Sequence, residues 1–357
     1  MSGSTHAHTR PSARRADFQP PPHRRFRAPR RRTRRRVALA GLFLVLAGAV
    51  LALLLTRDEA PEQPAAAPGQ PAATAYPVGA PIQVPGLPTG VLSSPEAVWV
   101  VTGPEGRLLR LDQSLSRLAT PGTLIGGRPV ALSSAFRSIW VASTDSGVVS
   151  RFSPHTFSVT ARIPVGDSPV WLTPDPTGMW VVNREDDTLM RINPLRDRVS
   201  GRPIRVGDEP TSVGWGHGAL WVTNSGDDSL SRVDPRKRKV IETIKVGDHP
   251  TGIAISGDSV WVSNFEDDNV MRVEIATNRV TKTIPVGDGP TYPRVGTSVW
   301  VPNSLDGTIT RIDPRTNRVV GQPIRIGQTV DRISTGAMGF WVISYADQTL
   351  TRLEAAE

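Results

Sequence analysis

The chain has 357 residues, 38% of them hydrophobic and 21% charged, which is typical of a globular protein with one large domain or two ordinary ones. The absence of cysteine excludes disulfides, thiol catalysis and cysteine-ligated metals. The net charge of +9 is local: residues 1–36 hold twelve Arg and one acidic residue, Asp17, and subtracting their +11 leaves −2 for residues 37–357. The basic pI therefore gives no case for nucleic-acid binding by the rest of the chain.

The first 36 residues are rich in Arg and Pro and are predicted to form a disordered cytoplasmic tail. Such a tail sets membrane topology and contacts anionic lipid headgroups. Docking of nucleic acid or protein in the cytoplasm is the alternative role for these arginines.

Residues 37–55, from Val37 to Leu55, contain no charge and would span about 28 Å as a helix, close to the thickness of a bilayer core. Because six arginines lie just before this segment, the positive-inside rule places the N-terminus in the cytoplasm and the rest outside. The sequence therefore predicts a single-pass signal anchor in the cell membrane. A cleaved signal peptide is the alternative, since Thr33-Arg34-Arg35 resembles a twin-arginine signal; both predictions export the C-terminal domain.

Residues 56–78 are rich in Pro and Ala and predict a semi-rigid linker. The rest of the chain is repetitive. Trp recurs every 39 to 41 residues, at Trp99, Trp140, Trp180, Trp221, Trp261, Trp300 and Trp341. Val follows each of these Trp residues directly, and Arg follows eleven positions later in all seven copies.

Each repeat contains four short β-rich runs separated by Gly, Asp and Asn clusters. The strand that carries the Trp is apolar on both faces, which suits a sheet packed between two others. The sequence therefore predicts an all-β fold over residues 79–357: a seven-bladed β-propeller of four-stranded blades. The last repeat lacks its fourth strand, and residues 79–85 are similar to the fourth strands at 201–207 and 321–327. We therefore expect an N-terminal strand to complete the seventh blade and close the ring.

The Val-Trp-Val-Ser-Asn strand, the Val-Gly-Asp-x-Pro turn and the period of about 40 residues resemble YVTN-type β-propeller repeats. Relatives of similar appearance include streptogramin lyases and bacterial lactonases, and many others resemble binding or surface proteins. The resemblance implies a propeller fold over residues 79–357. It also implies that ligands bind at the mouth of the central channel.

A residue present in every repeat is most simply structural, so the seven Trp are expected to pack in the core. The seven Arg are expected to make charge-assisted bonds within or between blades, with acidic neighbours such as Asp234 and Asp313. The turns at the mouth are rich in Asp, which either caps its own turn or attracts cations, metals or basic partners.

Binding residues are expected where the repeats differ at the mouth. The candidates are Arg128, Trp171, Arg184, His249, Tyr292, Arg294, Asp331 and Arg332. Trp171 and Tyr292 are interpreted either as stacking surfaces at the channel entrance or as side chains that fill the channel. Arginine beside an aromatic ring suits a planar or anionic ligand such as a carboxylate or a sugar.

Within the repeats the histidines are His155, His217 and His249, and only His249 is predicted at the mouth. No catalytic residue is assigned, and no cofactor is expected. The sequence predicts a monomeric binding, scaffold or sensor module for an envelope ligand or protein partner. The alternative is a lyase or lactonase-like hydrolase with a divalent metal at the channel mouth.

Overall fold

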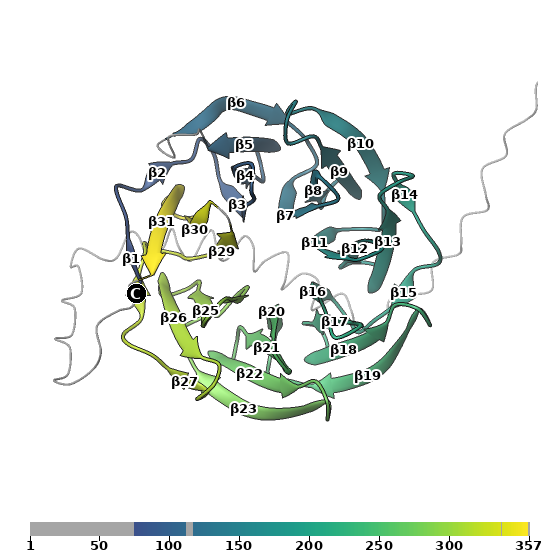
Figure 1. Cartoon of the computed structure of the whole chain (residues 1–357), viewed down its shortest axis with the longest axis vertical. Helices are drawn as coiled ribbons and strands as arrows, with labels where there is room; N and C mark the ends of the chain where they lie inside the picture. The colour runs from purple at the N-terminus through teal and green to yellow at the C-terminus, as the bar shows by residue number, and fades with distance from the viewer. Residues whose placement is uncertain (1–74, 112–116, 337, 356–357) are drawn as a thin grey trace, which may run out of the picture. The chain divides into compact units, whose positions relative to one another are not determined.

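The computed structural model describes residues 75–111, 117–336 and 338–355. These residues form seven antiparallel sheets arranged as a ring, with the first strand of each sheet nearest the central axis (Figure 1). The predicted all-β, seven-bladed propeller with four-stranded blades is confirmed.

Blade 1 consists of β3 (Pro88–Ser93), β4 (Val98–Thr102), β5 (Arg107–Leu111) and β6 (Leu118–Leu124). Blade 2 consists of β7 (Pro129–Ala135), β8 (Ser138–Ser143), β9 (Val148–Phe152) and β10 (Val159–Pro164). Blade 3 consists of β11 (Pro169–Asp175), β12 (Gly178–Asn183), β13 (Thr188–Asn193), β14 (Arg198–Val199) and β15 (Ile204–Arg205). Blade 4 consists of β16 (Pro210–Gly216), β17 (Ala219–Asn224), β18 (Ser229–Asp234) and β19 (Lys239–Lys245). Blade 5 consists of β20 (Pro250–Ser256), β21 (Ser259–Asn264), β22 (Asn269–Glu274) and β23 (Arg279–Pro285). Blade 6 consists of β24 (Arg294–Val295), β25 (Val299–Asn303), β26 (Thr308–Asp313), β27 (Arg318–Val319) and β28 (Ile324–Arg325). Blade 7 consists of β29 (Arg332–Gly336), β30 (Gly339–Ser344) and β31 (Thr349–Ala355), completed by β1 (Ala75–Pro77) and β2 (Ile82–Gln83).

Antiparallel pairing gives the ring two distinct faces. The turn that leads into the first strand of a blade and the turn between its second and third strands lie together, as the bond from Asp167 N to Asp186 Oδ2 (2.8 Å) shows in blade 3. We call this the mouth face. The other two turns of each blade, between strands one and two and between strands three and four, lie on the far face.

The tryptophans form the contacts between blades. All seven are buried, and the most exposed of them, Trp300, is only 6% exposed. Trp221 packs with Val260 and Val262 of the next blade, which flank the next Trp in the sequence. Trp341 packs with Val98 and Val100 of blade 1 and so closes the ring. Burying one such ring between two β-branched side chains contributes about 1.5–3 kcal/mol.

The N-terminal strand completes blade 7, as predicted. β2 pairs with β31 through Ile82↔Leu350 and Gln83↔Thr349. β1 also pairs with β31, although the sequence places its residues in the linker. The outer strands of blades 3, 6 and 7 are each divided into two short pieces by Gly-x-Pro. The glycine there has positive φ and the proline lacks an N–H, so the ladder is interrupted.

The recurring Arg bonds to the next blade in blades 2, 4 and 5. In blade 2, Arg151 Nη1 donates to Asp197 Oδ1 of blade 3 (2.8 Å), and its guanidinium lies 5.2 Å from the centroid of the Trp140 ring. Arg232 likewise donates to Asn278 of the following blade (2.8 Å). The expectation of bonds between blades is met, but the partners are not Asp234 and Asp313. Those two carboxylates accept bonds from backbone N–H groups of their own turns, because each lies two or three residues before the donors.

The predicted signal anchor, residues 37–55, lies outside the described residues. Among the described residues, no helix is long and apolar enough to cross a membrane.

Candidate functional site

The innermost strand of each blade carries one equivalent position at which the blades differ in side-chain size. It precedes the core Trp by nine residues, or by eight in blade 6, and we call the set the central column. Its members are Gly90, Ala131, Trp171, Ser212, Gly252, Tyr292 and Arg332. Four of these side chains are small or absent. The three large ones come from blades 3, 6 and 7, so they have the space to meet at the axis.

The three large members of the central column are in mutual contact. The rings of Trp171 and Tyr292 stack with centroids 4.6 Å apart and an interplanar angle of 9°. Arg332 Cζ lies 4.0 Å from the centroid of the Tyr292 ring and 4.8 Å from that of Trp171. The guanidinium of Arg294 lies 5.5 Å from the Trp171 centroid. Because blades 3 and 6 are not neighbours, this stacking spans the axis, and the two rings are not separate surfaces at the channel entrance.

An irregular inner strand in blade 6 positions Tyr292. Pro290 and Pro293 remove two backbone donors, and the regular pairing is reduced to the two residues of β24. In its place, Tyr292 forms a parallel bridge to Arg332 of blade 7. The Thr291 hydroxyl donates to the Asp331 carbonyl (3.1 Å), which ties the two blades together beside the bridge.

The cluster carries two positive charges that form no ion pair among the described residues. Arg294 and Arg332 are half-buried. Burial, with a smaller contribution from the charge of Arg332, lowers the pKa of Arg294 to about 10. Burial also lowers the pKa of Arg332, opposed by the Tyr292 hydroxyl and Asp331. Among the residues that the structure describes, the ion pairs all involve other side chains, so neither guanidinium has a carboxylate partner.

Asp331 lies next to Arg332 in the sequence, but its carboxylate holds a turn. It accepts bonds from Tyr345 N (2.7 Å), the Thr329 hydroxyl (3.0 Å) and the Ser304 hydroxyl (3.3 Å). Burial raises the pKa of Asp331, partly offset by these donors and by Arg332. The carboxylate therefore links blade 7 to blade 6 and forms no ion pair with either arginine.

Two more predicted residues form a second group on the mouth face. Arg184 donates to Glu209 Oε2 (3.0 Å) and is an ion-pair partner of that residue. His249 is half-buried, and its ring lies 6.1 Å from that of Phe265. Burial lowers the pKa of His249, and the charge of Arg184 adds to this, against Glu266, Glu209 and Asp248. Arg128, the remaining candidate, is exposed on the turn leading into blade 2.

The Asp-Asp pairs of the mouth turns bind backbone. In blade 3, Asp186 accepts from Asp167 N of its own blade, whereas Asp187 accepts from Glu209 N of the next blade (2.9 Å). The pairs 227–228 and 267–268 repeat this division. The capping interpretation of these residues is therefore the one that the hydrogen bonds support. Among the described residues, no group of three or more His, Asp or Glu side chains is arranged to hold a metal ion.

Sequence reasoning missed two sets of residues that position the site. Glu209 forms an ion pair with Arg184, but glutamate does not recur at this position of the repeat. Thr211 and Thr251 donate to the Pro carbonyl of the next blade (2.9 and 3.0 Å), as Thr89 does (2.7 Å). The recurrence of Pro-Thr at the start of four repeats is the signal that could have revealed them.

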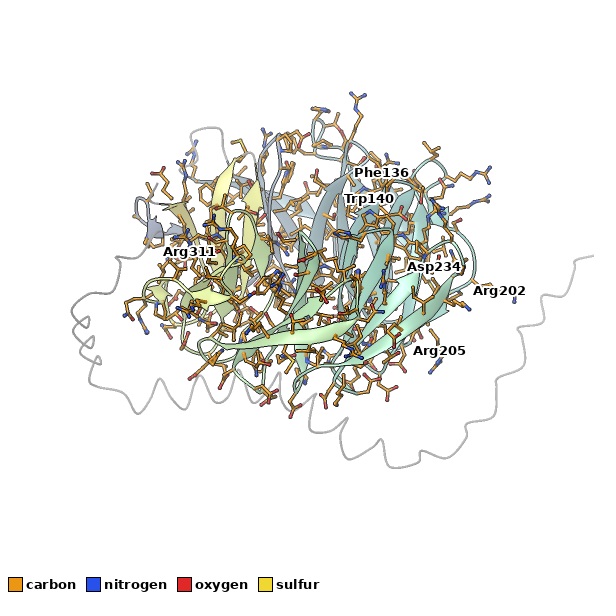
Figure 2. The ribbon with its side chains drawn as sticks, turned by 60° about the horizontal axis from the view of Figure 1, so that its bottom comes forward. Phe136, Trp140, Arg202, Arg205, Asp234 and Arg311 are labelled. Atoms are coloured by element: carbon orange, nitrogen blue, oxygen red, sulfur yellow. The ribbon has the colours of Figure 1, made fainter. Side chains whose placement is uncertain are left out.

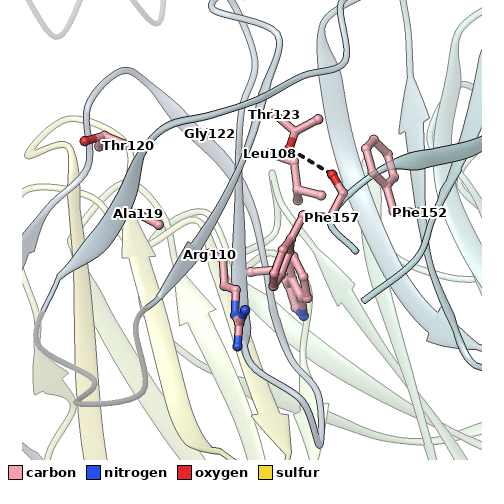
Figure 3. A pocket seen from close by; sticks show the side chains of 9 residues that line it. Leu108, Arg110, Ala119, Thr120, Gly122, Thr123, Phe152 and Phe157 are labelled. Atoms are coloured by element: carbon pink, nitrogen blue, oxygen red, sulfur yellow. Dashed lines mark hydrogen bonds between the residues drawn. The ribbon is translucent and has the colours of Figure 1, made fainter. Parts of the chain in front are cut away.

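A hollow of about 200 Å³ lies between blades 1 and 2. Its walls are mostly apolar, and its charged member, Arg110, lies 4.3 Å from the centroid of the Phe157 ring (Figure 3). Phe157 occupies the turn position where Asp197 of blade 3 binds Arg151, so this hollow is a variation of the contact between blades. None of the predicted binding residues lines it, although the core residue Trp99 does.

No protein-family model matches the chain, and no curated protein sequence is similar to it. Solved structures are similar in fold. A streptogramin B lyase matches with a TM-score of 0.66 and 16% identity, covering 79% of this chain and 96% of that chain. A virginiamycin B lyase from Staphylococcus aureus matches with a TM-score of 0.67 and 16% identity, covering 77% of this chain and 98% of that chain. A hydrazine synthase from Kuenenia stuttgartiensis matches with a TM-score of 0.65 and 16% identity, covering 77% and 97%. At this identity the likeness establishes a seven-bladed propeller similar to streptogramin B lyase, and nothing about activity.

Proposed function

We propose that this chain is an exported, membrane-anchored binding module with YVTN-type repeats, and that its ligand is an anion bound at the central axis of the propeller. The observation that carries the proposal is the pair of half-buried guanidinium groups, Arg294 and Arg332, beside the stacked rings of Trp171 and Tyr292. The membrane anchor rests on residues 37–55 of the sequence and on the arginines before them.

An anion is favoured because the cluster has excess positive charge in a place that is poor in water. Two like charges that are both desolvated destabilise the folded protein, and a bound carboxylate removes both penalties at once. Arginine is suited to this because its planar group binds a carboxylate with two parallel hydrogen bonds. The rings beside it favour a ligand whose anionic group is attached to a planar one.

The enzyme alternative has the fold likeness as its support. It needs a general base, and His249 is the histidine on the mouth face, but Glu209 and Arg184 lie near it and no metal-binding group of acidic or His residues accompanies it among the described residues. The binding role is favoured because its residues meet in one cluster. The cluster also uses the residues in which the repeats differ.

The test is a thermal and urea unfolding screen of residues 67–357, the compact unit that contains every strand of the closed ring. The probes are benzoate, salicylate, phthalate and inorganic phosphate, with neutral benzamide as control. A probe at one hundred times its Kd should raise the free energy of unfolding by about 2.7 kcal/mol. The shift should be lost in Arg332→Gln and Arg294→Gln and kept in Arg137→Gln, an exposed arginine of the far face.

The proposal fails if no anionic probe stabilises the wild type, or if the two cluster variants respond as the wild type does. Adding Ca²⁺, Mg²⁺ or Zn²⁺, with EDTA as control, tests the alternative. If a metal stabilises the wild type and this effect is lost in His249→Ala, the lyase or hydrolase function is favoured over the binding module.

A further inference from the structure

The far face carries a band of exposed positive charge on four consecutive blades. It occupies the turns between the third and fourth strands of blades 3 to 6 and the adjoining half of each outer strand. We call it the basic belt. Its exposed members are Arg196, Arg198, Arg202, Arg236, Lys237, Lys239, Arg279, Lys282, Arg315 and Arg318. Figure 2 shows Arg202 pointing away from the edge of the propeller.

The charge is segregated by the fold. Residues 79–357 contain 29 Lys or Arg and 29 Asp or Glu, so the propeller has no net charge. The four belt segments, residues 194–202, 235–242, 276–282 and 314–319, contain eleven of the basic residues and two of the acidic ones, Asp197 and Glu242. Asp197 is already bound to Arg151. The matching turn of blade 2, residues 153–158, contains no Lys or Arg. The belt is therefore confined to one side of the ring.

Large apolar side chains are exposed within the same segments. Leu195 is 93% exposed at the tip of the turn between β13 and β14, with Arg196 beside it. Ile241, Val280 and Val319 on the outer strands are 43%, 36% and 40% exposed. A surface that alternates basic and apolar side chains suits an interface that is anionic outside and apolar inside.

The N-terminal segment joins the propeller on the far face. β1 runs beside the end of β31, with Ala75 opposite Ala355, and the third strand of every blade ends on the far face. Ala75, the first described residue, therefore lies on the face that carries the basic belt. Residues 56–74 leave room for about 60 Å of extended chain, so the linker does not by itself fix the orientation.

We propose that the basic belt docks on an anionic phospholipid bilayer and holds the far face against it. The mouth face, with Arg184 and His249, then points away from the membrane. A bilayer fits better than a soluble polyanion because Leu195 and the exposed Val and Ile side chains gain from insertion between headgroups. A nucleic acid would favour exposed aromatic rings, and the exposed large apolar residues of the belt are aliphatic. The inference stands independently of the anion site at the axis.

The first experiment is vesicle co-sedimentation of residues 67–357, which contain no predicted anchor. The far-face triple variant is R198Q/K239Q/R318Q. Its matched control, R205Q/K245Q/R325Q, changes residues that are also exposed, at the mouth-face end of the outer strands of the same blades. Vesicles of phosphatidylcholine with 30 mol% phosphatidylglycerol are compared with pure phosphatidylcholine. We expect the wild type and the control to bind the anionic vesicles, and the far-face triple to bind roughly tenfold to one hundredfold more weakly.

The second experiment reports orientation. Because the chain has no cysteine, Leu195→Cys and Leu305→Cys can each be labelled at a single site with an environment-sensitive fluorophore. Leu305 is 50% exposed in the turn between β25 and β26, on the mouth face. The label at position 195 should shift to the blue on anionic vesicles, and the label at position 305 should not.

Four outcomes would overturn the proposal: no binding to anionic vesicles, equal losses in the two triple variants, equal binding to neutral vesicles, or no blue shift at position 195. Displacement of the protein from vesicles by dextran sulfate without any blue shift would assign the belt to a soluble polyanion instead. Circular dichroism of both triple variants confirms that each is folded before the comparison is made.

Discussion

Single residues at the axis show a conflict between stability and binding. Arg294 and Arg332 are held near each other and away from water, which costs free energy that a core built for stability would avoid. Charged groups that are buried without a partner gather at sites of function. The free energy of unfolding of the ligand-free protein therefore tests whether the two arginines destabilise the fold.

We predict that Arg294→Met raises the free energy of unfolding of the ligand-free protein by about 1 kcal/mol, because it removes a desolvated charge and keeps an apolar contact with Trp171. Urea unfolding at neutral pH measures the change, with Arg137→Met as the control on an exposed arginine. A loss of stability in Arg294→Met would show that its contact with the ring stabilises the fold more than its charge destabilises it.

A second prediction at this scale concerns His249, whose pKa burial lowers from its ordinary value near 6.5, with help from Arg184. The unfolded chain then binds a proton more readily than the folded protein as the pH falls below about 6.5. The free energy of unfolding should therefore fall in that range, and above it His249 should have no effect on the pH dependence. Urea unfolding of the wild type and of His249→Gln between pH 5.5 and 7.5 should give a steeper decrease for the wild type; equal slopes would refute the prediction.

At the scale of elements, hydrogen bonds between turns connect one blade to the next. The first Asp of the pair in blade 3 caps the turn of its own blade, and the second, Asp187, accepts from Glu209 N of blade 4. In blades 2, 4 and 5, the Arg on the third strand bonds the far-face turn of the following blade. Blades 4 and 5 are therefore each bonded to the next blade on both faces, and Trp221 packs between blades 4 and 5.

We predict that Asp187→Ala lowers the free energy of unfolding by about 1–3 kcal/mol, because it leaves Glu209 N without its acceptor in a partly buried place. Glu185→Ala, an exposed position in the same turn, should change stability by no more than about 0.5 kcal/mol. Chemical denaturation of both variants makes the comparison, and similar effects of the two would mean that the capping bond is replaced by water at no cost.

At the scale of the whole molecule, stability depends on closing the ring. The chain begins and ends in blade 7, where β1 and β2 cover the edge of β31. Without them, β31 would present unpaired backbone groups, which promote aggregation. The same arrangement places the start of β1 and the basic belt on one face.

Residues 86–357, which lack β1 and β2, are therefore predicted to unfold at a lower temperature than residues 67–357 and to form oligomers in size-exclusion chromatography. Moving residues 75–85 to a position after Glu357 through a flexible linker should restore the monomer and most of the lost thermal stability, because the strand can pair with β31 from either end of the chain. If the rearranged chain does not recover stability, the covalent connection between β2 and blade 1 also contributes to stability, in addition to the pairing with β31.

The sequence by itself determined the number of blades, the Trp core and the closure of the ring, because these depend on patterns that recur every 40 residues and on strand alternation. It also identified Trp171, Tyr292, Arg294 and Arg332 as departures from the repeat. That these four meet was decided by the tertiary structure, since positions up to 161 residues apart converge only when seven blades close around one axis. The same is true of the basic belt. Its turns are separated by about 40 residues in the chain, and only the ring places them side by side on the face where β1 joins the propeller.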